Sequence, residues 1–476
     1  MGNRAPEKNN GQVTVCGNYY IYSFHSTNNL NLIHISMKNT VLIFFSVLLM
    51  AVTDTQAQPA KQVMQMANAD SARLVELFRD LHQHPELAFM EKRTSAIVSG
   101  GLKALGYEVI TGIGKTGVIG ILKNGNGPVV MYRADMDCNA VKESTGLSYS
   151  STKTMINSEG IEVPVMHACG HDAHITWMLG AAKIMAALKK EWKGTLVFVA
   201  QPAEEIGAGA KAMLLDSMYN KGVPVADFLL GMHTVPLPVG KVDNAFGERM
   251  AGTDQIDITF YGIGGHGASP EFTKDPIVMG SNAVLQYQTI ISRNIAAQDI
   301  AVLTVGAFNA GNSNNVIPSS AVLKLNLRWF NNKTRNTLIE HIKRINEGIA
   351  IANHLPGDMY PTMEIKTTAM PLVNDKAMSE KINKALTSLL PEQNIITNRP
   401  ALMVSEDFHY LVYDNKKAAY DFLFVGIANP EAVTKANKEG RQYPFFNHSN
   451  DFQVDLSAIP LGTAIGSTAL LEMFRK

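Results

Sequence analysis

The sequence predicts an α/β protein with a smaller α+β unit inserted into it. Between residues 117 and 231, short apolar runs alternate with helical patterns, which indicates a sheet covered by helices on both faces. Between residues 254 and 368 the order becomes strand, helix, strand, strand, helix, strand, which is typical of a small sandwich with a four-stranded sheet. Helical and strand patterns like those of the first part return after Pro371. At 476 residues the chain is too long for one ordinary core, so we expect two domains.

The larger unit begins with two helical patterns. In the first, apolar residues recur at helical spacing from Leu74 to Leu81, and the second covers residues 91–105. A further helix is expected from Asp172, whose negative charge in the first turn favours the helix dipole. The remaining elements expected in this unit are strands at 117–122, 128–132, 195–200 and 227–231 and helices at 208–217 and 458–474.

The smaller unit has its own strand and helix patterns. In residues 255–260 apolar and polar side chains alternate, as in a strand with one buried face. The other strands are expected at 300–308, 321–329 and 363–368, and the helices at 278–291 and 333–352.

Composition places the chain among soluble globular proteins, with 46% hydrophobic and 18% charged residues. The 42 basic and 42 acidic residues balance, and the sequence has no basic block interleaved with aromatic residues. We therefore expect no nucleic-acid partner. Without repeats or a disulfide framework, a structural or adhesion module is not favoured.

The N-terminal segment does not resemble part of the fold. Residues 37–57 combine a basic start at Lys38, an apolar stretch at 40–52 and a small-residue exit, as in a signal peptide. The apolar stretch is short for a membrane span, which needs about 20 residues, and an uncleaved anchor is the alternative. Residues 1–36 are polar and aperiodic, so we interpret them as a doubtful upstream extension before a true start at Met37. We expect an exported protein, periplasmic or secreted, with no membrane span in the mature chain.

The sequence contains three cysteines, Cys16, Cys138 and Cys169. Exported proteins normally pair their cysteines in disulfides. Cys16 falls in the N-terminal segment, and Cys169 has a better use as a metal ligand. We therefore predict no disulfide.

Three polar clusters follow predicted strands: Asp135, the pair Glu204 and Glu205, and His233. Ligand sites in open α/β sheets lie at the carboxyl ends of the strands, so residues far apart in the sequence can meet there. The late histidine His448 offers a further imidazole. Together these residues predict a site at this edge of the sheet.

The loop with Cys169 and His171 adds a thiolate and an imidazole, which are good ligands for metals such as Zn²⁺. Taken alone, Cys169 could be a small buried hydrophobe and His171 a helix start. Gly170 between them and Asp172 after them favour metal binding. His174, one turn later, either supports a ligand or belongs to the core, and the sequence leaves this open.

Glu204 and Glu205 follow a predicted buried strand. Successive side chains point in different directions, so one carboxylate can bind metal while the other faces a substrate. The alternative is a solvated acidic loop, which the buried strand before them and the glycine-rich turn after them disfavour. Metal ligands together with a free base that acts on water are what a metal-assisted hydrolase needs.

Several motifs together resemble the M20 family of metallopeptidases. The resemblance is strongest to its aminoacylase-type amidohydrolase branch, which includes hippurate hydrolases and auxin-conjugate hydrolases. It covers residues 70–476, and its most specific motif is Met-His-Ala-Cys-Gly-His-Asp at 166–172. The other matching segments lie at 81–87, 133–137, 201–205, 231–233, 264–266, 315–318, 405–408 and 447–449.

The resemblance implies a mixed-sheet, di-metal hydrolase catalytic domain with an inserted ferredoxin-like lid and dimerisation domain. The catalytic domain would comprise residues 70–248 and 369–476, and the lid residues 249–368. Two divalent ions per subunit are implied, Zn²⁺ or Mn²⁺, and the softness of a thiolate favours Zn²⁺.

The resemblance also implies a role for each site residue. Glu204 matches the general base, and Asp135 matches an aspartate that orients a metal-ligating group. The residues that match metal ligands are Cys169, His171, Glu205, His233 and His448.

Three positions of the predicted lid match residues near the substrate. His266 matches a histidine that reaches across a dimer to the substrate carbonyl, so a homodimer is implied. Asn315 and Arg328 match positions that contact the polar end of the substrate. A guanidinium pairs well with a carboxylate, although a surface-strand arginine is the alternative for Arg328.

The sequence departs from the usual pattern of this branch at a few positions, namely Cys138, Gly267, Glu271 and Asn450. None is an expected ligand, but the first three are expected to reshape the substrate pocket. The predicted function is therefore metal-dependent hydrolysis of the amide bond of N-acyl amino acids, of N-acetyl or N-benzoyl type. The alternatives are a dipeptidase or carboxypeptidase acting on short peptides at the same site, or a non-catalytic exported metal- or ligand-binding protein.

Overall fold

The computed structural model describes residues 60–412, 414–415 and 417–475. The expected upstream extension at 1–36, the expected signal peptide at 37–57 and Cys16 lie outside these residues. Within the described ranges, no helix is both long and apolar enough to cross a lipid bilayer.

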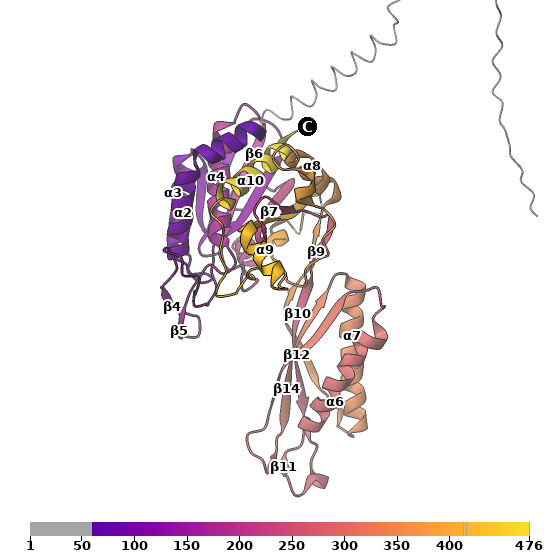
Figure 1. Ribbon diagram of the computed structural model, residues 1–476. Helices are drawn as coiled ribbons and strands as arrows, with labels where there is room; N and C mark the ends of the chain where they lie inside the picture. The colour runs from indigo at the N-terminus through magenta and orange to yellow at the C-terminus, as the bar shows by residue number, and fades with distance from the viewer. Residues whose placement is uncertain (1–59, 413, 416, 476) are drawn as a thin grey trace, which may run out of the picture. The chain divides into compact units, whose positions relative to one another are not determined.

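A mixed eight-stranded sheet forms the centre of the larger unit (Figure 1). Its strands, in their order across the sheet, are β1 (Glu108–Ile113), β2 (Gly117–Asn124), β6 (Gly194–Gln201), β3 (Val129–Asp135), β7 (Phe228–Pro238), β18 (Ala419–Ala428), β8 (Val242–Asp243) and β17 (Ile395–Ile396). Strands β6, β3, β7 and β18 are parallel neighbours, whereas β1 and β2 extend the sheet in antiparallel fashion. The predicted mixed α/β sheet is confirmed.

Helices cover both faces of this sheet. They are α2 (Ser71–Gln83), α3 (Lys92–Ala104), α4 (His171–Ala187), α5 (Gly209–Leu215), α8 (Lys376–Leu386), α9 (Pro430–Lys438) and α10 (Ala458–Phe474). Because successive strand side chains point to opposite faces, Leu196 and Phe198 join the core with α2, α3, α4 and α10. Val197 and Val199 instead pack with α5 and with the 3-10 helix at Phe408–Val412. The buried strand β6 therefore reads as a continuous apolar run, as expected for a strand covered on both sides.

Helices α4 and α10 pack closely against each other on the same face of the sheet. A Cβ atom at Gly180 would lie 2.6 Å from Thr463, and one at Gly462 would lie 2.3 Å from Trp177. Glycine at these two positions therefore allows α10 to pack tightly against α4. The bounds of α10 match the helix predicted at 458–474. Since α4 begins at His171, this packing also fixes the position of His171, near the end of the motif at 166–172.

Strand β7 is longer than predicted, and this corrects the expected place of His233. The strand continues to Pro238, so His233 lies inside it rather than after it. Pairing with β3 ends at Gly231, but pairing with β18 continues along β7. The longer neighbour β18 therefore extends β7 past the end of β3, and His233 lies just beyond that end.

The smaller unit is a four-stranded antiparallel sheet with two helices and a hydrophobic core of its own. Its elements, in chain order, are β10 (Gly252–Tyr261), α6 (Pro276–Thr289), a π-helical turn (Ile290–Asn294), β12 (Ala301–Ala310), β14 (Ser320–Trp329), α7 (Asn332–Ala352) and β15 (Thr362–Ala369). The strands lie in the order β12-β14-β10-β15, so the predicted β-α-β-β-α-β unit with its ferredoxin-like sheet is confirmed.

Three short ribbons complete the described structure. Strands β9 (Gly247–Met250) and β16 (Leu372–Asn374) pair where the chain enters and leaves the smaller unit. Strands β11 (Gly265–His266) and β13 (Val316–Ile317) form a ribbon within that unit. Strands β4 (Thr154–Ile156) and β5 (Glu162–Pro164) form a hairpin before α4.

Candidate metal centre

The five residues predicted as metal ligands come together in one cluster. The Cys169 Sγ atom lies 3.5 Å from Nε2 of His233 and 3.3 Å from Nε2 of His448. His448 Nε2 is also 3.3 Å from Oε2 of Glu205. The other oxygen of Glu205, Oε1, lies 3.6 Å from Nε2 of His171. Thiolate, imidazole and carboxylate donors from distant parts of the sequence therefore face one another.

The backbone around Cys169 is shaped to present this loop. Gly170 has a φ of 82°, and a Cβ atom there would lie 2.7 Å from the side chain of Thr234, so glycine is required. The Thr234 hydroxyl donates to the Cys169 carbonyl at 2.6 Å. His448 also has a positive φ, 68°, and its N–H donates to the Ala168 carbonyl at 2.7 Å. The two distant loops are thus joined through their backbones.

One hydrogen bond and one polar contact orient the imidazoles of His233 and His171. Nδ1 of His233 lies 2.8 Å from the Thr234 carbonyl, so this nitrogen donates and Nε2 keeps its lone pair toward Cys169. Nδ1 of His171 lies 3.3 Å from Oδ1 of Asp137, which leaves Nε2 toward Glu205. Such an outer contact at the second ring nitrogen is typical of histidines that bind metal.

Several buried polar atoms here have no hydrogen-bond partner among the described residues. Nε2 of His171 and Oε1 of Glu205 face each other, and Nδ1 of His171 and Oδ1 of Asp137 are the others. Buried polar atoms are rarely left unsatisfied, because desolvation without a partner costs free energy. A cation between Nε2 of His171 and Oε1 of Glu205 would satisfy both. The donor set of sulfur, nitrogen and oxygen therefore fits a borderline divalent ion such as Zn²⁺.

Electrostatics around Cys169 favour the thiolate. Burial alone raises the pKa of its thiol, but the imidazoles of His233, His171 and His448 outweigh burial and hold this pKa well below its ordinary value. A thiolate, rather than a thiol, is the form that binds metal.

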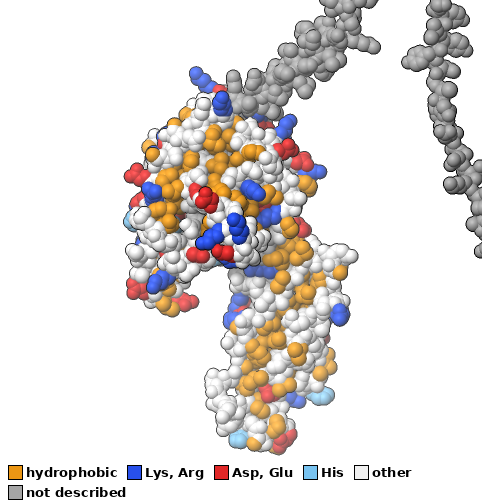
Figure 2. Space-filling model, viewed as in Figure 1, with side chains coloured by type: hydrophobic (Ala, Val, Ile, Leu, Met, Phe, Trp, Pro, Cys, Tyr) orange, Lys and Arg blue, Asp and Glu red, His pale blue; other side chains and the backbone are white. Residues whose placement is uncertain are grey.

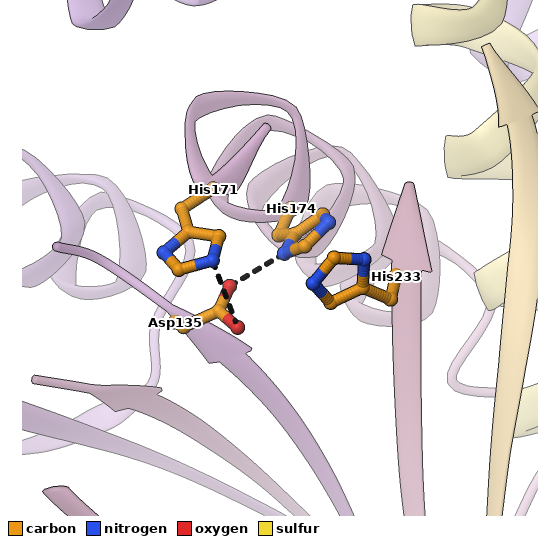
Figure 3. A group of neighbouring side chains, drawn as sticks. All are labelled: Asp135, His171, His174 and His233. Atoms are coloured by element: carbon orange, nitrogen blue, oxygen red, sulfur yellow. Dashed lines mark hydrogen bonds and ion pairs between the residues drawn. The ribbon is translucent and has the colours of Figure 1, made fainter. Parts of the chain in front are cut away.

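The sequence left the role of His174 open, and in the structure both of its ring nitrogens contact neighbouring groups. Its Nε2 accepts the N–H of Thr234 at 2.9 Å, and its Nδ1 is hydrogen-bonded to Asp135. Burial lowers the pKa of His174 to about 4, so the ring is neutral. Figure 3 shows it between Asp135 and His233, beside His171. Both of its nitrogens are therefore already used.

Asp135 lies at the end of β3, as predicted, and is fully buried. One oxygen accepts from His174, while the other accepts from Nη1 of Arg133 at 2.7 Å and lies 3.6 Å from Nε2 of His171. Burial by itself raises the pKa of Asp135, but His171, His174 and Arg133 hold it well below its ordinary value. Asp135 thus contacts two histidines of the cluster, which agrees with an orienting role.

Glu204 lies between the cluster that Glu205 joins and a second group of carboxylates. Its Oε2 is 3.9 Å from Nε2 of His171, and a carboxylate oxygen of Glu204 lies within 4.8 Å of oxygens of Glu406 and Asp407. Burial, with the charges of Glu406 and Glu205, raises the pKa of Glu204 well above its ordinary value. The two adjacent carboxylates therefore have different, partly overlapping surroundings.

The residues beside Glu204 form a buried polar network that the sequence analysis missed. Arg133 is buried and donates to Glu406 at 2.9 Å and to Gln201 at 2.9 Å. Asp407 accepts from Gln201 at 2.6 Å and from the N–H of Ala210 at 3.0 Å. Glu406 and Asp407 belong to the matching segment at 405–408, and Arg133 to that at 133–137, but nothing in the sequence showed that they meet.

The three predicted lid residues have different places. His266 is exposed on β11, opposite Val316, and Asn315 lies next to it on the same ribbon. No recorded contact among the described residues joins either of them to the five donors. Arg328, on β14, donates from Nη1 to the Ser405 hydroxyl at 2.6 Å. Because Ser405 precedes Glu406, Arg328 lies near the Glu204 group.

The mixed sheet, the inserted four-stranded sheet and the donor cluster define the class of metal-dependent hydrolases. Residues 131–440 match the peptidase family M20/M25/M40. The chain belongs to this family, and the resemblance inferred from its motifs is confirmed.

Similar proteins share most of this chain. It is 40% identical over 348 residues to the hippurate hydrolase of Campylobacter jejuni, which covers 72% of this chain and 85% of that protein. It is 38% identical over 281 residues to the N-acetylcysteine deacetylase of Bacillus subtilis, covering 58% of this chain and 70% of the relative.

Two solved structures show the same fold. A putative aminohydrolase from methicillin-resistant Staphylococcus aureus matches with a TM-score of 0.76 and 28% identity, over 87% of this chain and 100% of its own. A Bacillus subtilis protein described as a dinuclear metal binding peptidase of the M20 family matches with a TM-score of 0.68 and 28% identity, over 86% of this chain and 99% of its own.

Proposed function

We propose that this protein is a metal-dependent amidohydrolase that cleaves N-acyl amino acids to a carboxylate and a free amino acid. The proposal rests on the different contacts made by the adjacent carboxylates of Glu204 and Glu205. Glu205 contacts both His171 and His448, whereas Glu204 approaches only His171, at 3.9 Å, and also lies beside Glu406 and Asp407. This arrangement supplies metal ligands and one separate base. Relatives named hippurate hydrolase and N-acetylcysteine deacetylase support the substrate class.

The proposed metal centre holds two divalent ions per subunit. Its ligands are Cys169, His171, Glu205, His233 and His448. The thiolate of Cys169 favours Zn²⁺ over the harder Mn²⁺. When bound, such ions lower the pKa of a water molecule and polarise a carbonyl oxygen. The solved relative described as dinuclear supports the number of ions.

Glu204 is the proposed general base. It is the carboxylate beside Glu205 that does not contact His448, and its Oε2 lies 3.9 Å from Nε2 of His171, so it is placed to take a proton from water at the centre. The same carboxyl then delivers this proton to the leaving amine, so one residue serves both halves of the reaction. Asp135, through His174 and His171, keeps the histidine side of the centre in place.

Arg328 is the proposed anchor for the carboxylate of the substrate. Its guanidinium donates only to neutral oxygens, those of Asn326 at 2.9 Å and Ser405 at 2.6 Å. No described carboxylate forms an ion pair with it. Burial lowers the pKa of Arg328, which shows that its charge is partly desolvated. A half-buried cation without a counter-charge attracts an anionic ligand.

The proposed assembly is a homodimer formed through the smaller unit. Strand β12 is an edge of its sheet, so its free backbone groups can pair with a second copy. Val278 and Leu285 on α6 and Phe308 on β12 are exposed apolar side chains. Figure 2 shows hydrophobic side chains along the face where α6 and α7 lie. We propose that His266 of one copy reaches the substrate carbonyl at the metal centre of the other copy. Light scattering of the wild type and of Leu285→Glu measures the oligomeric state. A dimeric wild type and a monomeric variant are expected, and a monomeric wild type contradicts the proposal.

The proposed location is outside the cytoplasm, after removal of the segment at 37–57. The proposal is supported by the signal-peptide pattern of that segment. N-terminal sequencing of the mature protein is expected to give a start near Gln58. A mature end well upstream of Gln58 contradicts export by this route.

A substrate panel tests the proposed reaction. The full chain, reconstituted with Zn²⁺ or Mn²⁺, is assayed on N-acetyl amino acids, N-benzoyl amino acids and dipeptides. Faster turnover of the acylated amino acids is expected. Faster turnover of dipeptides indicates a peptidase, and metal binding without turnover of any substrate indicates a non-catalytic protein.

A further inference from the structure

We infer that two buried carboxylates, Glu91 and Asp137, brace the turn that carries Glu204 and Glu205, and thereby decide which of these faces the metal centre. The inference rests on the proposed roles of Glu204 and Glu205. Glu91 and Asp137 are positioning residues, because they act through the backbone and side chains of others.

The turn itself has a conformation that needs support. After β6 ends at Gln201, Ala203 has a φ of 51°, which is uncommon for a residue other than glycine, and it is fully buried. Such strain persists only where the surrounding structure holds it. The Glu204 carbonyl accepts the N–H of Gly207 at 2.7 Å, and the Ala203 carbonyl accepts that of Gly209 at 3.1 Å. The carbonyls of the turn are thus satisfied by the residues that follow it.

Glu91 holds the turn on one side of Glu204. Its Oε1 accepts the N–H of Ala203 at 2.9 Å and that of Phe89 at 2.9 Å. Its Oε2 accepts the hydroxyl of Thr116 at 2.5 Å. Glu91 is fully buried, so water cannot replace it as the acceptor for Ala203. The strained residue directly before Glu204 therefore depends on this one carboxylate.

Asp137 holds the turn on the other side. Its Oδ2 accepts the N–H of Glu205 at 3.0 Å, and its Oδ1 lies 3.3 Å from Nδ1 of His171. Asp137 is also fully buried. One carboxylate thus joins the backbone of one proposed ligand to the ring of another, and keeps Nε2 of His171 directed toward Glu205.

The two braces predict separable effects. Loss of the brace at Ala203 moves the base, Glu204, but leaves Glu205 held by Asp137. Loss of the brace at Glu205 disturbs two ligands, but leaves Ala203 held by Glu91. Turnover and metal affinity therefore respond to different substitutions.

The test compares Glu91→Ala, Glu91→Gln and Asp137→Asn in the full chain, with kcat and KM measured at saturating Zn²⁺ and Zn²⁺ affinity measured by calorimetry. For Glu91→Ala we expect kcat to fall by roughly 10²-fold, as for a misplaced catalytic group, with Zn²⁺ affinity unchanged. Glu91→Gln keeps an oxygen for both N–H groups and is expected to restore most of kcat. Asp137→Asn is expected to weaken Zn²⁺ binding by roughly 10- to 100-fold, while kcat at saturating Zn²⁺ changes little.

Matched controls separate positioning from general damage. Glu86 is a buried carboxylate of the same segment that caps α3 through the N–H groups of Arg93 and Thr94 and does not touch the turn. Asp421 is a buried aspartate with no recorded contact to the five donors. Glu86→Ala is expected to lower the unfolding temperature but not kcat, and Asp421→Asn is expected to leave Zn²⁺ affinity unchanged.

The inference is wrong if Glu91→Ala lowers kcat no more than Glu86→Ala, or if Asp137→Asn binds Zn²⁺ as tightly as Asp421→Asn. Should Glu91→Ala fail to fold, Thr116→Val replaces it in the test. This variant removes only the hydroxyl that donates to Glu91, and it is also expected to lower kcat. If the wild type hydrolyses none of the panel, the proposed function fails, while the effect of Asp137 on Zn²⁺ affinity is still measured. The two failures are therefore distinguishable.

Discussion

The guanidinium of Arg328 and the hydroxyl of Ser405 form a 2.6 Å hydrogen bond between the smaller sheet and the segment beside the metal centre. Ser405 also donates to the carbonyl of Ala251 at 3.1 Å, at the entrance to the smaller unit. A carboxylate oxygen of Glu406, the next residue, lies within 4.8 Å of one of Glu204. Arg328 and Glu204 are thus linked through the consecutive residues Ser405 and Glu406. The proposed anchor for the substrate carboxylate therefore lies near the proposed base.

Arg328→Ala is expected to lower kcat/KM for acylated amino acids by roughly 10- to 100-fold, the loss of one charged hydrogen-bonding partner. The amides of the same substrates, which lack the carboxylate, are expected to show little change. Steady-state kinetics on matched acid and amide substrates measure this. Arg344→Ala, which removes an exposed arginine paired with Glu340, is the control. Equal losses on both substrates contradict the anchor.

Glu204→Gln is expected to retain metal and to lower kcat by roughly 10²- to 10⁴-fold, since an amide cannot accept the proton. Glu205→Gln is expected instead to lose metal, because it removes the negative charge from a proposed ligand whose Oε1 faces the ligand atom Nε2 of His171. Metal analysis after dialysis, together with kcat, distinguishes the two. Metal loss in Glu204→Gln contradicts the assignment of the free base.

Cys169→Ser is expected to weaken Zn²⁺ binding more than Mn²⁺ binding, because a hydroxyl is a harder donor than a thiolate. The Sγ atom contacts both His233 and His448, so its loss affects both. Calorimetric titration with each ion measures the change in preference. Cys138→Ser is the control, since Cys138 is also buried and unpaired. An unchanged ratio of the two affinities argues that sulfur is not a ligand.

Gly170→Ala is expected to destabilise the protein by about 1–3 kcal/mol, through the strained φ and a contact of 2.7 Å with Thr234. Because the change moves the Cys169 loop, metal affinity is expected to fall as well. Gly160 has a similar φ of 79° but nothing within 4 Å of its would-be Cβ, so Gly160→Ala isolates the cost of φ alone. Urea unfolding compares them, and equal losses show that the Thr234 contact is unimportant.

His82 gives the protein a dependence of stability on pH. It is buried between Asp172 at 2.6 Å and Glu143 at 3.2 Å. Burial alone lowers its pKa, but the two carboxylates outweigh burial and raise it from 6.5 to about 9. Because the folded-state pKa is raised, the stabilisation is fully present below about pH 6.5 and is lost as the pH rises through about 9.

The charged His82 is expected to contribute at most about 3 kcal/mol to the free energy of unfolding. His82→Gln is therefore expected to remove most of the loss of stability between about pH 6.5 and 9, which urea unfolding across that range measures. His84→Gln, at the exposed end of the same helix, is the control. A wild-type slope that persists in His82→Gln assigns the pH dependence to another group.

Local patterns in the sequence were sufficient for most of the fold. Apolar periodicity predicted α10, the strands β2, β3, β6 and β7 and the four strands of the smaller sheet, because the spacing of buried side chains differs between helix and strand. The end of β7 was not predictable in this way, since it depends on the length of its neighbour β18. His233 was therefore placed after a strand that in fact contains it.

The donor set of the candidate site could be predicted from the sequence, because residues such as Cys169 and His448 carry recognisable chemistry at motif positions. The sequence could not determine what surrounds them. Arg133 and Glu406 are separated by 273 positions yet form a buried pair, and only the folded chain shows this. The chemical groups of a side chain follow from the sequence. Burial, orientation and charge pairing arise only when distant segments of the chain meet in the fold. The contacts through which His174, Glu91 and Asp137 are proposed to support the site could therefore be seen only in the tertiary structure.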